Sequence, residues 1–261
     1  MMVLPKSLRR LAFMACLPVL ACNGADIAIP ENAVVSTTLC ADGYLHSLPD
    51  IEPRLAALSW QSRSALSQTP EHLKSLPQAD NDKERRLNWS QATQISSAGG
   101  GGDIDLQWGE DFETVWKNFD ILSTKLDVPD PSPGLKSRLK SIEHPANSPR
   151  ILYLNRSGGT AGPETFVDAV IKAAGGINII ETPGWQSPDT ETLIRLQPDI
   201  ILTSFTKSNY AGVNDRTLRH EALADKINSV PQIDIPGRYW TCAGPGLVDA
   251  TEHLNQAMAK L

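Results

Sequence analysis

The sequence predicts an α/β protein built of two lobes, each with a parallel sheet, and a helical connection between the lobes. Two observations predict this fold class. In the second half of the chain, short apolar runs alternate with segments of helical periodicity, which is typical of a parallel sheet covered by helices. Near the middle, an amphipathic stretch is followed by a cluster of prolines, which indicates a connection between two lobes.

Length and composition agree with this fold class. The 261 residues suffice for one large or two small domains, and 41% hydrophobic with 21% charged residues is ordinary for a globular chain. The net charge of -6 argues against a nucleic-acid-binding surface, which needs clustered Lys and Arg. Beyond the N-terminus, no segment approaches the ~20 uninterrupted apolar residues of a membrane-spanning helix. We therefore expect no such helix in the body of the protein.

Residues 1–25 have the order of charged and apolar residues that export signals share. Three basic residues lie among the first ten, and the apolar run Leu11–Ala21 that follows is too short to span a membrane. Val19–Cys22 (Val-Leu-Ala-Cys) resembles a bacterial lipobox, which predicts lipidation of its cysteine; cleavage after Ala25 is the alternative. In both cases the protein is expected in the periplasm or elsewhere outside the cytoplasmic membrane.

Residues 26–110 are expected to form the N-terminal lobe. β-branched and apolar runs predict its strands, and prolines separate the elements. The expected elements are strands at Val34–Thr37, Leu55–Ser59 and Thr93–Ser97, and a helical stretch at Asp82–Trp89. The glycine run Gly99–Gly102 is expected to be a flexible loop. We expect no phosphate site there, because its spacing fits no phosphate-binding fingerprint.

Residues 111–149 are expected to connect the lobes. Apolar residues recur there at three- and four-residue spacing, which predicts a helix over about 111–126. Three prolines within 129–133 break this pattern, and a second helical piece is expected over 135–142.

Residues 150–261 are expected to form the C-terminal lobe, in which strands and helices alternate. The expected strands are Ile151–Leu154, Asn178–Glu181, Ile200–Leu202 and Gln232–Ile235. The expected helices are Thr165–Ala174, Thr190–Leu196, Leu218–Ile227 and Leu247–Leu261. A double glycine after the first of these helices is a typical helix end.

Four segments of the second half also carry a resemblance to a known family. They are Thr165–Ile180 (TFVDAVIKAAGGINII), Gly184–Ser204 (GWQSPDTETLIRLQPDIILTS), Val230–Trp240 and Gly244–Leu261. In these segments the chain resembles the periplasmic binding proteins for vitamin B12, ferric siderophores and haem, which serve ABC importers. The resemblance implies two Rossmann-like lobes joined by a connecting helix. It is thinner in the first lobe, where Ala92-Thr93 replaces the usual Pro-Asp.

Aromatic residues follow predicted strands on both lobes. They are Trp60 on the first lobe and Trp185, Tyr239 and Trp240 on the second, and Arg238 lies in the same loop as Tyr239. Ligands of open parallel sheets bind beyond the carboxyl ends of the strands, so we expect these residues to line a ligand site. Aromatic faces suit a flat macrocycle or a catecholate, and the guanidinium suits a carboxylate, phosphate or chelate charge. The resemblance places Trp185 at an aromatic position that B12-binding members use.

The alternative is that the four aromatic residues pack in the core or between the lobes, and that Arg238 is a solvated loop charge. The resemblance also implies a surface that docks on the importer. Glu191 matches the acidic residue that family members present to the importer's arginines, and Glu84 is the comparable residue of the first lobe, with its spacing off by one. A solvated helix face is the alternative for both glutamates.

Cys40 and Cys242 remain in the mature protein if the two earlier cysteines belong to the signal. Two cysteines in an exported protein are more often a disulfide than anything else. Both stand at strand-to-helix turns near the expected cleft, one on each lobe, so that a disulfide would tether the lobes, whereas two thiolates would form a soft-metal site. A disulfide or buried free thiols are favoured, because no His-x-Cys or Cys-x-x-Cys spacing supports a metal.

The resemblance, with which the export signal and the aromatic residues agree, implies a monomeric solute-binding protein. It would capture a metal chelate (a corrinoid, a ferric siderophore or haem) and deliver it to an ABC importer permease, with no chemistry performed, no permanently bound cofactor and no nucleic-acid partner. The alternatives are a bare metal-ion receptor or an orphan ligand sensor of the same fold. A hydrolytic enzyme is less favoured, because no Gly-x-Ser-x-Gly elbow is present and no cysteine is visibly paired with a base.

Overall fold

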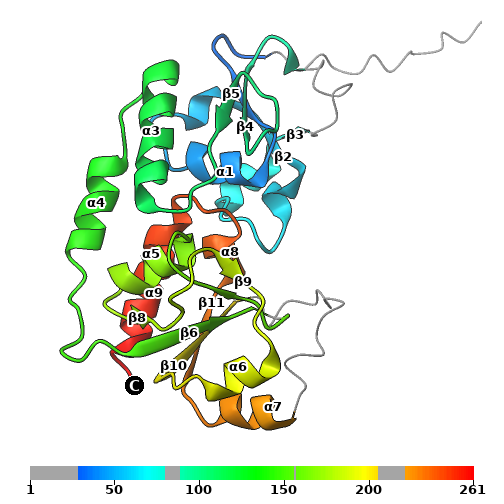
Figure 1. Ribbon diagram of the computed structural model, residues 1–261. Helices are drawn as coiled ribbons and strands as arrows, with labels where there is room; N and C mark the ends of the chain where they lie inside the picture. Colours follow the sequence, from blue (N-terminus) through cyan, green and yellow to red (C-terminus); the bar gives the residue numbers. More distant parts are fainter. Residues whose placement is uncertain (1–28, 80–88, 156, 205–220) are drawn as a thin grey trace, which may run out of the picture.

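Two lobes lie one above the other, and two helices run along one side of them (Figure 1). The structure is a computed structural model that describes residues 29–79, 89–155, 157–204 and 221–261. Each lobe contains a parallel sheet, so the predicted α/β fold with two parallel-sheet lobes is confirmed. The expected export signal with Cys22, and Glu84 with most of its expected helix, lie outside the described residues.

The first lobe contains a five-stranded parallel sheet in the order β3-β2-β1-β4-β5. The strands are β1 (Val34–Ser36), β2 (Leu55–Ser59), β3 (Gln78–Ala79), β4 (Thr93–Ser97) and β5 (Ile104–Leu106). Val34 and Val35, at the centre of the sheet, are fully buried, as suits β-branched residues in a strand covered on both faces. Helix α1 (Leu39–Leu45) follows β1, and a 3-10 turn, Trp60–Arg63, follows β2.

The connection consists of two helices, α3 (Phe112–Leu126) and α4 (Ser132–Lys140). Helix α3 begins where the Asp111 carboxylate accepts a hydrogen bond of 2.8 Å from the backbone N–H of Thr114, and it ends at Asp127, whose φ is 53°. The helix predicted over about 111–126 is thereby confirmed. Prolines after its end prevent one uninterrupted helix, because proline lacks the backbone donor that a helix interior needs.

The second lobe contains a four-stranded parallel sheet in the order β11-β10-β6-β8, and a separate antiparallel pair, β7 and β9. The strands are β6 (Arg150–Leu154), β7 (Thr160–Ala161), β8 (Ile177–Asn178), β9 (Trp185–Gln186), β10 (Ile200–Ser204) and β11 (Gln232–Ile235). The helices are α5 (Phe166–Ala173), α6 (Thr190–Arg195), α7 (Glu221–Asn228), α8 (Gly237–Trp240) and α9 (Gly246–Met258). All five residues of β10 are buried, which explains its nearly continuous apolar sequence.

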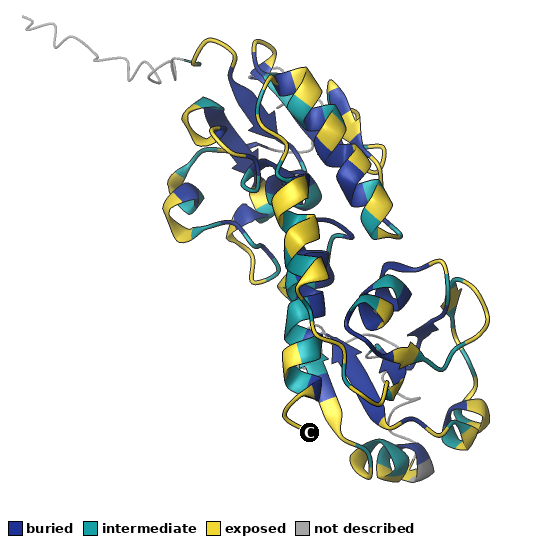
Figure 2. Cartoon of the chain, turned by 90° about the vertical axis from the view of Figure 1, so that its left-hand side faces the viewer, coloured by how far each residue is buried: buried dark blue, intermediate teal, exposed yellow. Residues whose placement is uncertain are grey.

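The lobes are packed against each other as well as connected. One cluster of buried side chains runs from the first sheet through α3 to β6, α5 and α9 of the second lobe, and buried strands are visible within both lobes in Figure 2. Gly109 of the first lobe approaches the second so closely that an added Cβ would lie 2.5 Å from the carbonyl oxygen of Ala243. Among the described residues, none of the helices has both the length and the apolar character that crossing a membrane requires.

Candidate functional site

Trp60 and Trp185 both present indole rings to solvent, one on each lobe. Trp60 comes directly after β2 and is 58% exposed, and its carbonyl oxygen accepts a hydrogen bond of 3.0 Å from Nε2 of Gln78. Trp185 lies on β9 and is 47% exposed. Both remain candidates for ligand contact, because an exposed aromatic side chain has a large apolar face that a ligand can cover.

Five aromatic rings gather where the two lobes meet, and we call them the aromatic cluster: Trp108, Tyr153, Phe166, Trp185 and Trp240. The Phe166 ring is central to it. Its centroid lies 5.3 Å from that of Trp185, 5.8 Å from that of Trp240 and 6.3 Å from that of Trp108. These separations are typical of favourable aromatic pairs. Helix α5 fixes Phe166 as its first residue, because Thr165 caps that helix through the backbone N–H of Asp168.

Trp108 belongs to the first lobe and was not predicted as a site residue. It follows β5, is 41% exposed, and meets Phe166 of the second lobe edge-on. The sequence contains a signal for it, because Ile104 and Leu106 alternate with a polar residue, which is the pattern of a short strand ahead of Trp108. In the structure this strand is β5, and both apolar residues are buried. Trp108 and Trp185 thus approach the same ring from opposite lobes.

Trp240 is a buried member of the aromatic cluster. Its side chain is 2% exposed, and its ring packs edge-on against Tyr153 at 5.6 Å as well as against Phe166. Its indole Nε1 is buried and finds no hydrogen-bond partner among the described residues. This burial agrees with the packing alternative for Trp240, and its expected ligand contact stays a prediction.

Arg238 and Tyr239 lie apart from the aromatic cluster. The guanidinium of Arg238 stands 4.7 Å from the Tyr239 ring centroid, and its Nη2 donates to the Tyr239 hydroxyl at 3.2 Å. Within the described part of the chain, the ring contact of Tyr239 is with His253 at 6.2 Å, on helix α9. The two residues expected beside Trp240 therefore occupy a different side of α8, and Arg238 lines a separate pocket.

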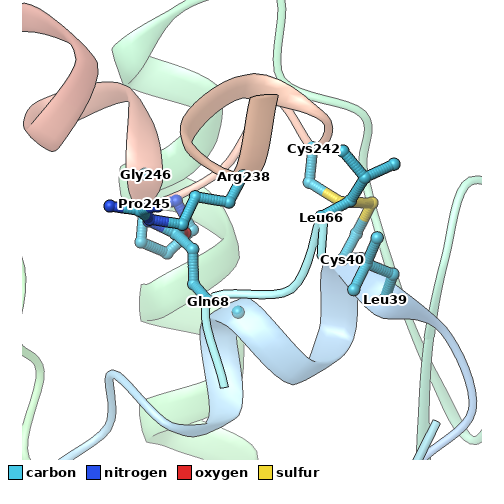
Figure 3. Close-up of a pocket in the computed structure, with 9 residues that line it drawn as sticks. Leu39, Cys40, Leu66, Gln68, Arg238, Cys242, Pro245 and Gly246 are labelled. Atoms are coloured by element: carbon cyan, nitrogen blue, oxygen red, sulfur yellow. A yellow bond between two sulfur atoms is a disulfide. The ribbon is translucent and has the colours of Figure 1, made fainter. Parts of the chain in front are cut away.

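Cys40 and Cys242 form a disulfide that joins the two lobes, with their Cα atoms 5.2 Å apart. Cys40 lies in the first turn of α1, and Cys242 follows α8. Figure 3 shows the disulfide at one end of the small pocket, with Arg238, Gln68 and Pro245 toward the other end. The pocket has room for about one water molecule, so it is too small for a chelate.

Asp42 is a buried carboxylate at the same end of the first sheet. Oδ1 accepts a hydrogen bond of 2.9 Å from the backbone N–H of Ser59, and Oδ2 accepts one of 2.5 Å from its hydroxyl. Burial raises the pKa of Asp42 to about 6, although hydrogen bonds from Ser36 and Ser59 act in the opposite direction. The group therefore links α1 to the last residue of β2, directly before Trp60.

The described residues provide no cluster of three or more His, Cys, Asp or Glu side chains that could hold a metal ion. His46 directly follows helix α1 of the first lobe. It caps the end of α1, burial lowers the pKa of its imidazole, and its Nε2 is buried without a hydrogen-bond partner in the described residues.

Glu191, the expected docking residue of the second lobe, is exposed in the first turn of α6. Its Oε1 lies 2.8 Å from Nη2 of Arg195, one turn further along the same helix. Because both side chains are largely exposed, this pair contributes little to stability and leaves the carboxylate available to a partner.

Comparison with curated proteins gives matches over a short stretch of the chain. No protein-family model matches the chain. A cobalamin-binding protein of Halobacterium salinarum is 39% identical over 59 residues, which is 21% of this chain. The matched stretch makes up 16% of that protein's length.

Solved structures match nearly the whole chain. The periplasmic heme-binding protein HutB of Vibrio cholerae is 16% identical, with a TM-score of 0.67 over 88% of this chain and 99% of HutB. The periplasmic vitamin B12 binding protein BtuF of Vibrio cholerae is also 16% identical, with a TM-score of 0.58 over 88% of this chain and 97% of BtuF. This chain shares their fold. The likeness extends over both lobes and the connection, because it covers so much of each chain.

Proposed function

We propose that the protein is an extracytoplasmic solute-binding protein that captures a metal chelate between its lobes and delivers it to an ABC importer. The observation that carries the proposal is the approach of Trp108 and Trp185 from opposite lobes toward one buried ring, with an indole face of each left in solvent. The periplasmic heme- and B12-binding proteins of the same fold, and the short match to a cobalamin-binding protein, support this choice.

The size and apolar character of the exposed indole rings explain why a metal chelate is the proposed ligand. An aromatic side chain buries ~150–250 Å² when it is covered, and a corrinoid, a haem or a catecholate siderophore offers a large flat face of the matching kind. Such a ligand is cargo, and we propose that the protein has no resident cofactor and performs no chemistry on it. Capture would therefore be reversible.

Ligand binding is tested by a thermal-shift and tryptophan-fluorescence screen of the purified protein against cyanocobalamin, haemin and a panel of ferric siderophores. A ligand at about 100 times its dissociation constant stabilises the folded state by ~2.7 kcal/mol, which shifts the unfolding midpoint measurably. If none of these chelates stabilises the protein, the proposal is contradicted. A bare metal-ion receptor or a ligand sensor would then be the favoured function.

Replacement of the exposed indole on the second lobe is the sharper test. We expect Trp185→Ala to raise the dissociation constant of the bound chelate about tenfold or more, equivalent to ~1.4 kcal/mol, because the ligand loses one aromatic face. Ile177→Ala is the matched control, since Ile177 is also an exposed apolar residue of this lobe but lies at the start of β8, where that strand pairs with the start of β6. Equal effects of the two substitutions would count against the site.

Glu191 is proposed to contact the importer, as its exposure on α6 allows. Glu191→Lys is expected to lower uptake of the chelate by cells several-fold, because it places a cation opposite the importer's arginines, while the affinity of the purified protein stays unchanged. Glu143→Lys, an exposed acid on the connection, is the charge-matched control. Normal uptake with Glu191→Lys would show that this residue does not contact the importer.

A further inference from the structure

The disulfide gives the molecule a second covalent connection between its lobes. The main chain passes from the first lobe to the second through α3 and α4, whereas Cys40 and Cys242 are 202 positions apart in the sequence and join the lobes elsewhere. Cys40 follows β1 of the first sheet, and Cys242 follows helix α8, which comes directly after β11 of the second sheet. The disulfide therefore bridges the two lobes at the ends of the sheets where Trp60 and the aromatic cluster lie.

On the first lobe, the turn that carries Cys40 is connected closely to Trp60. Asp42, two residues after the cysteine, is 1% exposed. Both of its carboxylate oxygens accept hydrogen bonds from Ser59, at 2.9 and 2.5 Å. Because Ser59 directly precedes Trp60, the position of α1 fixes the backbone from which that exposed indole projects.

On the second lobe, the turn that carries Cys242 is connected to Trp185. Trp240, two residues before the cysteine, packs against Phe166 and Tyr153 at centroid distances of 5.8 and 5.6 Å. These two rings in turn lie 5.3 and 6.3 Å from the ring of Trp185. The buried indole of Trp240 therefore supports the exposed one through two ring contacts.

We infer that the Cys40–Cys242 disulfide is a positioning element of the binding site, which sets the separation of Trp60 and Trp185 across the two lobes. The role in ligand binding rests on the proposed function, but the positioning itself is a property of the free protein. A second covalent connection restricts the relative motion of the lobes, so the two indole rings already have their binding positions in the free protein. Less conformational entropy is then lost when a ligand binds.

The positioning is tested first without any ligand. The chain has six tryptophans, and their indole N–H signals can be resolved by nuclear magnetic resonance in the purified protein and assigned with single Trp→Phe variants. In the double variant Cys40→Ser/Cys242→Ser, we expect the signals of Trp60 and Trp185 to shift or broaden. The signal of Trp89 should stay unchanged, because that ring packs in a separate small core at the first sheet.

Two results would overturn the inference. Unchanged Trp60 and Trp185 signals would show that the disulfide does not position them, and an equal change at Trp89 would show only general loosening of the fold. If the double variant fails to fold, the same spectra are recorded on the unsubstituted protein before and after reduction with a phosphine, with the free thiols counted.

The consequence for binding is measured with cyanocobalamin as the probe, by quenching of tryptophan fluorescence. We expect the double variant to bind about tenfold more weakly than the unsubstituted protein. Leu223→Ala is the control, because it removes a buried side chain from the outer core of the second lobe and destabilises the fold without touching the disulfide. Equal weakening in both variants would reject a positioning role. Absence of binding by the unsubstituted protein would contradict the proposed ligand, while the indole signals would still decide the role of the disulfide.

Discussion

At the scale of single residues, Asp42 makes the stability of the protein depend on pH. Its pKa of about 6 in the folded state exceeds the ordinary value of 3.8, so between these two pH values the folded protein holds a proton that the unfolded chain releases. The contribution of this group is therefore fully favourable below about pH 3.8 and is lost as the pH rises through 6.

Asp42→Asn should remove this dependence, because the amide cannot ionise but can still accept the hydrogen bond from the backbone of Ser59. We expect the unfolding free energy of the variant, measured relative to that of the unsubstituted protein, to be about 2 kcal/mol higher at pH 7 than at pH 4. Urea unfolding at several pH values measures this difference. A difference that does not vary with pH would show that the carboxylate is not the titrating group.

At the scale of elements, helix α4 makes ion pairs with the second lobe through Arg138, in addition to the apolar contacts of Leu135 and Leu139 with the core. Nη2 of Arg138 lies 2.7 Å from Oδ1 of Asp249 and 2.7 Å from Oε2 of Glu252, both on α9. The hydrogen bonds to these carboxylates raise the pKa of the guanidinium, so it stays charged throughout the ordinary pH range. Asp249 also accepts a hydrogen bond of 3.2 Å from Gln68 of the first lobe. Helix α9 of the second lobe therefore contacts both the first lobe and helix α4 of the connection.

Arg138→Ala should therefore loosen α4. Because the side chains are partly exposed, we expect a loss of only about 1 kcal/mol in unfolding free energy, smaller at high salt, together with faster amide exchange over residues 132–140. Arg138→Lys should restore little of this, because an ammonium cannot make the paired contacts of a guanidinium. Unchanged exchange in α4 after Arg138→Ala would mean that its apolar contacts hold it in place.

At the scale of the whole molecule, the disulfide closes a loop of about two hundred residues and so restricts the unfolded chain strongly. We expect Cys40→Ser/Cys242→Ser to lower the free energy of unfolding by about 2–5 kcal/mol, measured by guanidinium unfolding. The dependence on denaturant should become steeper, since the open chain exposes more surface when it unfolds. An unchanged transition midpoint would indicate that the disulfide does not limit the unfolded state.

Much of the fold could be read from the sequence, because its signals are local. The apolar run Ile200–Leu202, the cap residue Asp111 and the prolines after α3 each fix a strand, a helix start or a helix end from neighbours along the chain. The rule that ligands bind beyond the carboxyl ends of parallel strands then singled out Trp60 and Trp185. Both are exposed, Trp60 directly after β2 and Trp185 on the antiparallel strand β9.

The tertiary structure alone decided which of these residues come together. Trp108 joins Phe166 although the two belong to different lobes, and Trp240 turns inward while its neighbours Arg238 and Tyr239 lie on another side of α8. The burial of Asp42 likewise depends on how β2 lies beside α1. A sequence pattern reports which face of an element is apolar, but the contacts of a side chain depend on which elements lie opposite that face, and those elements are far away in the chain.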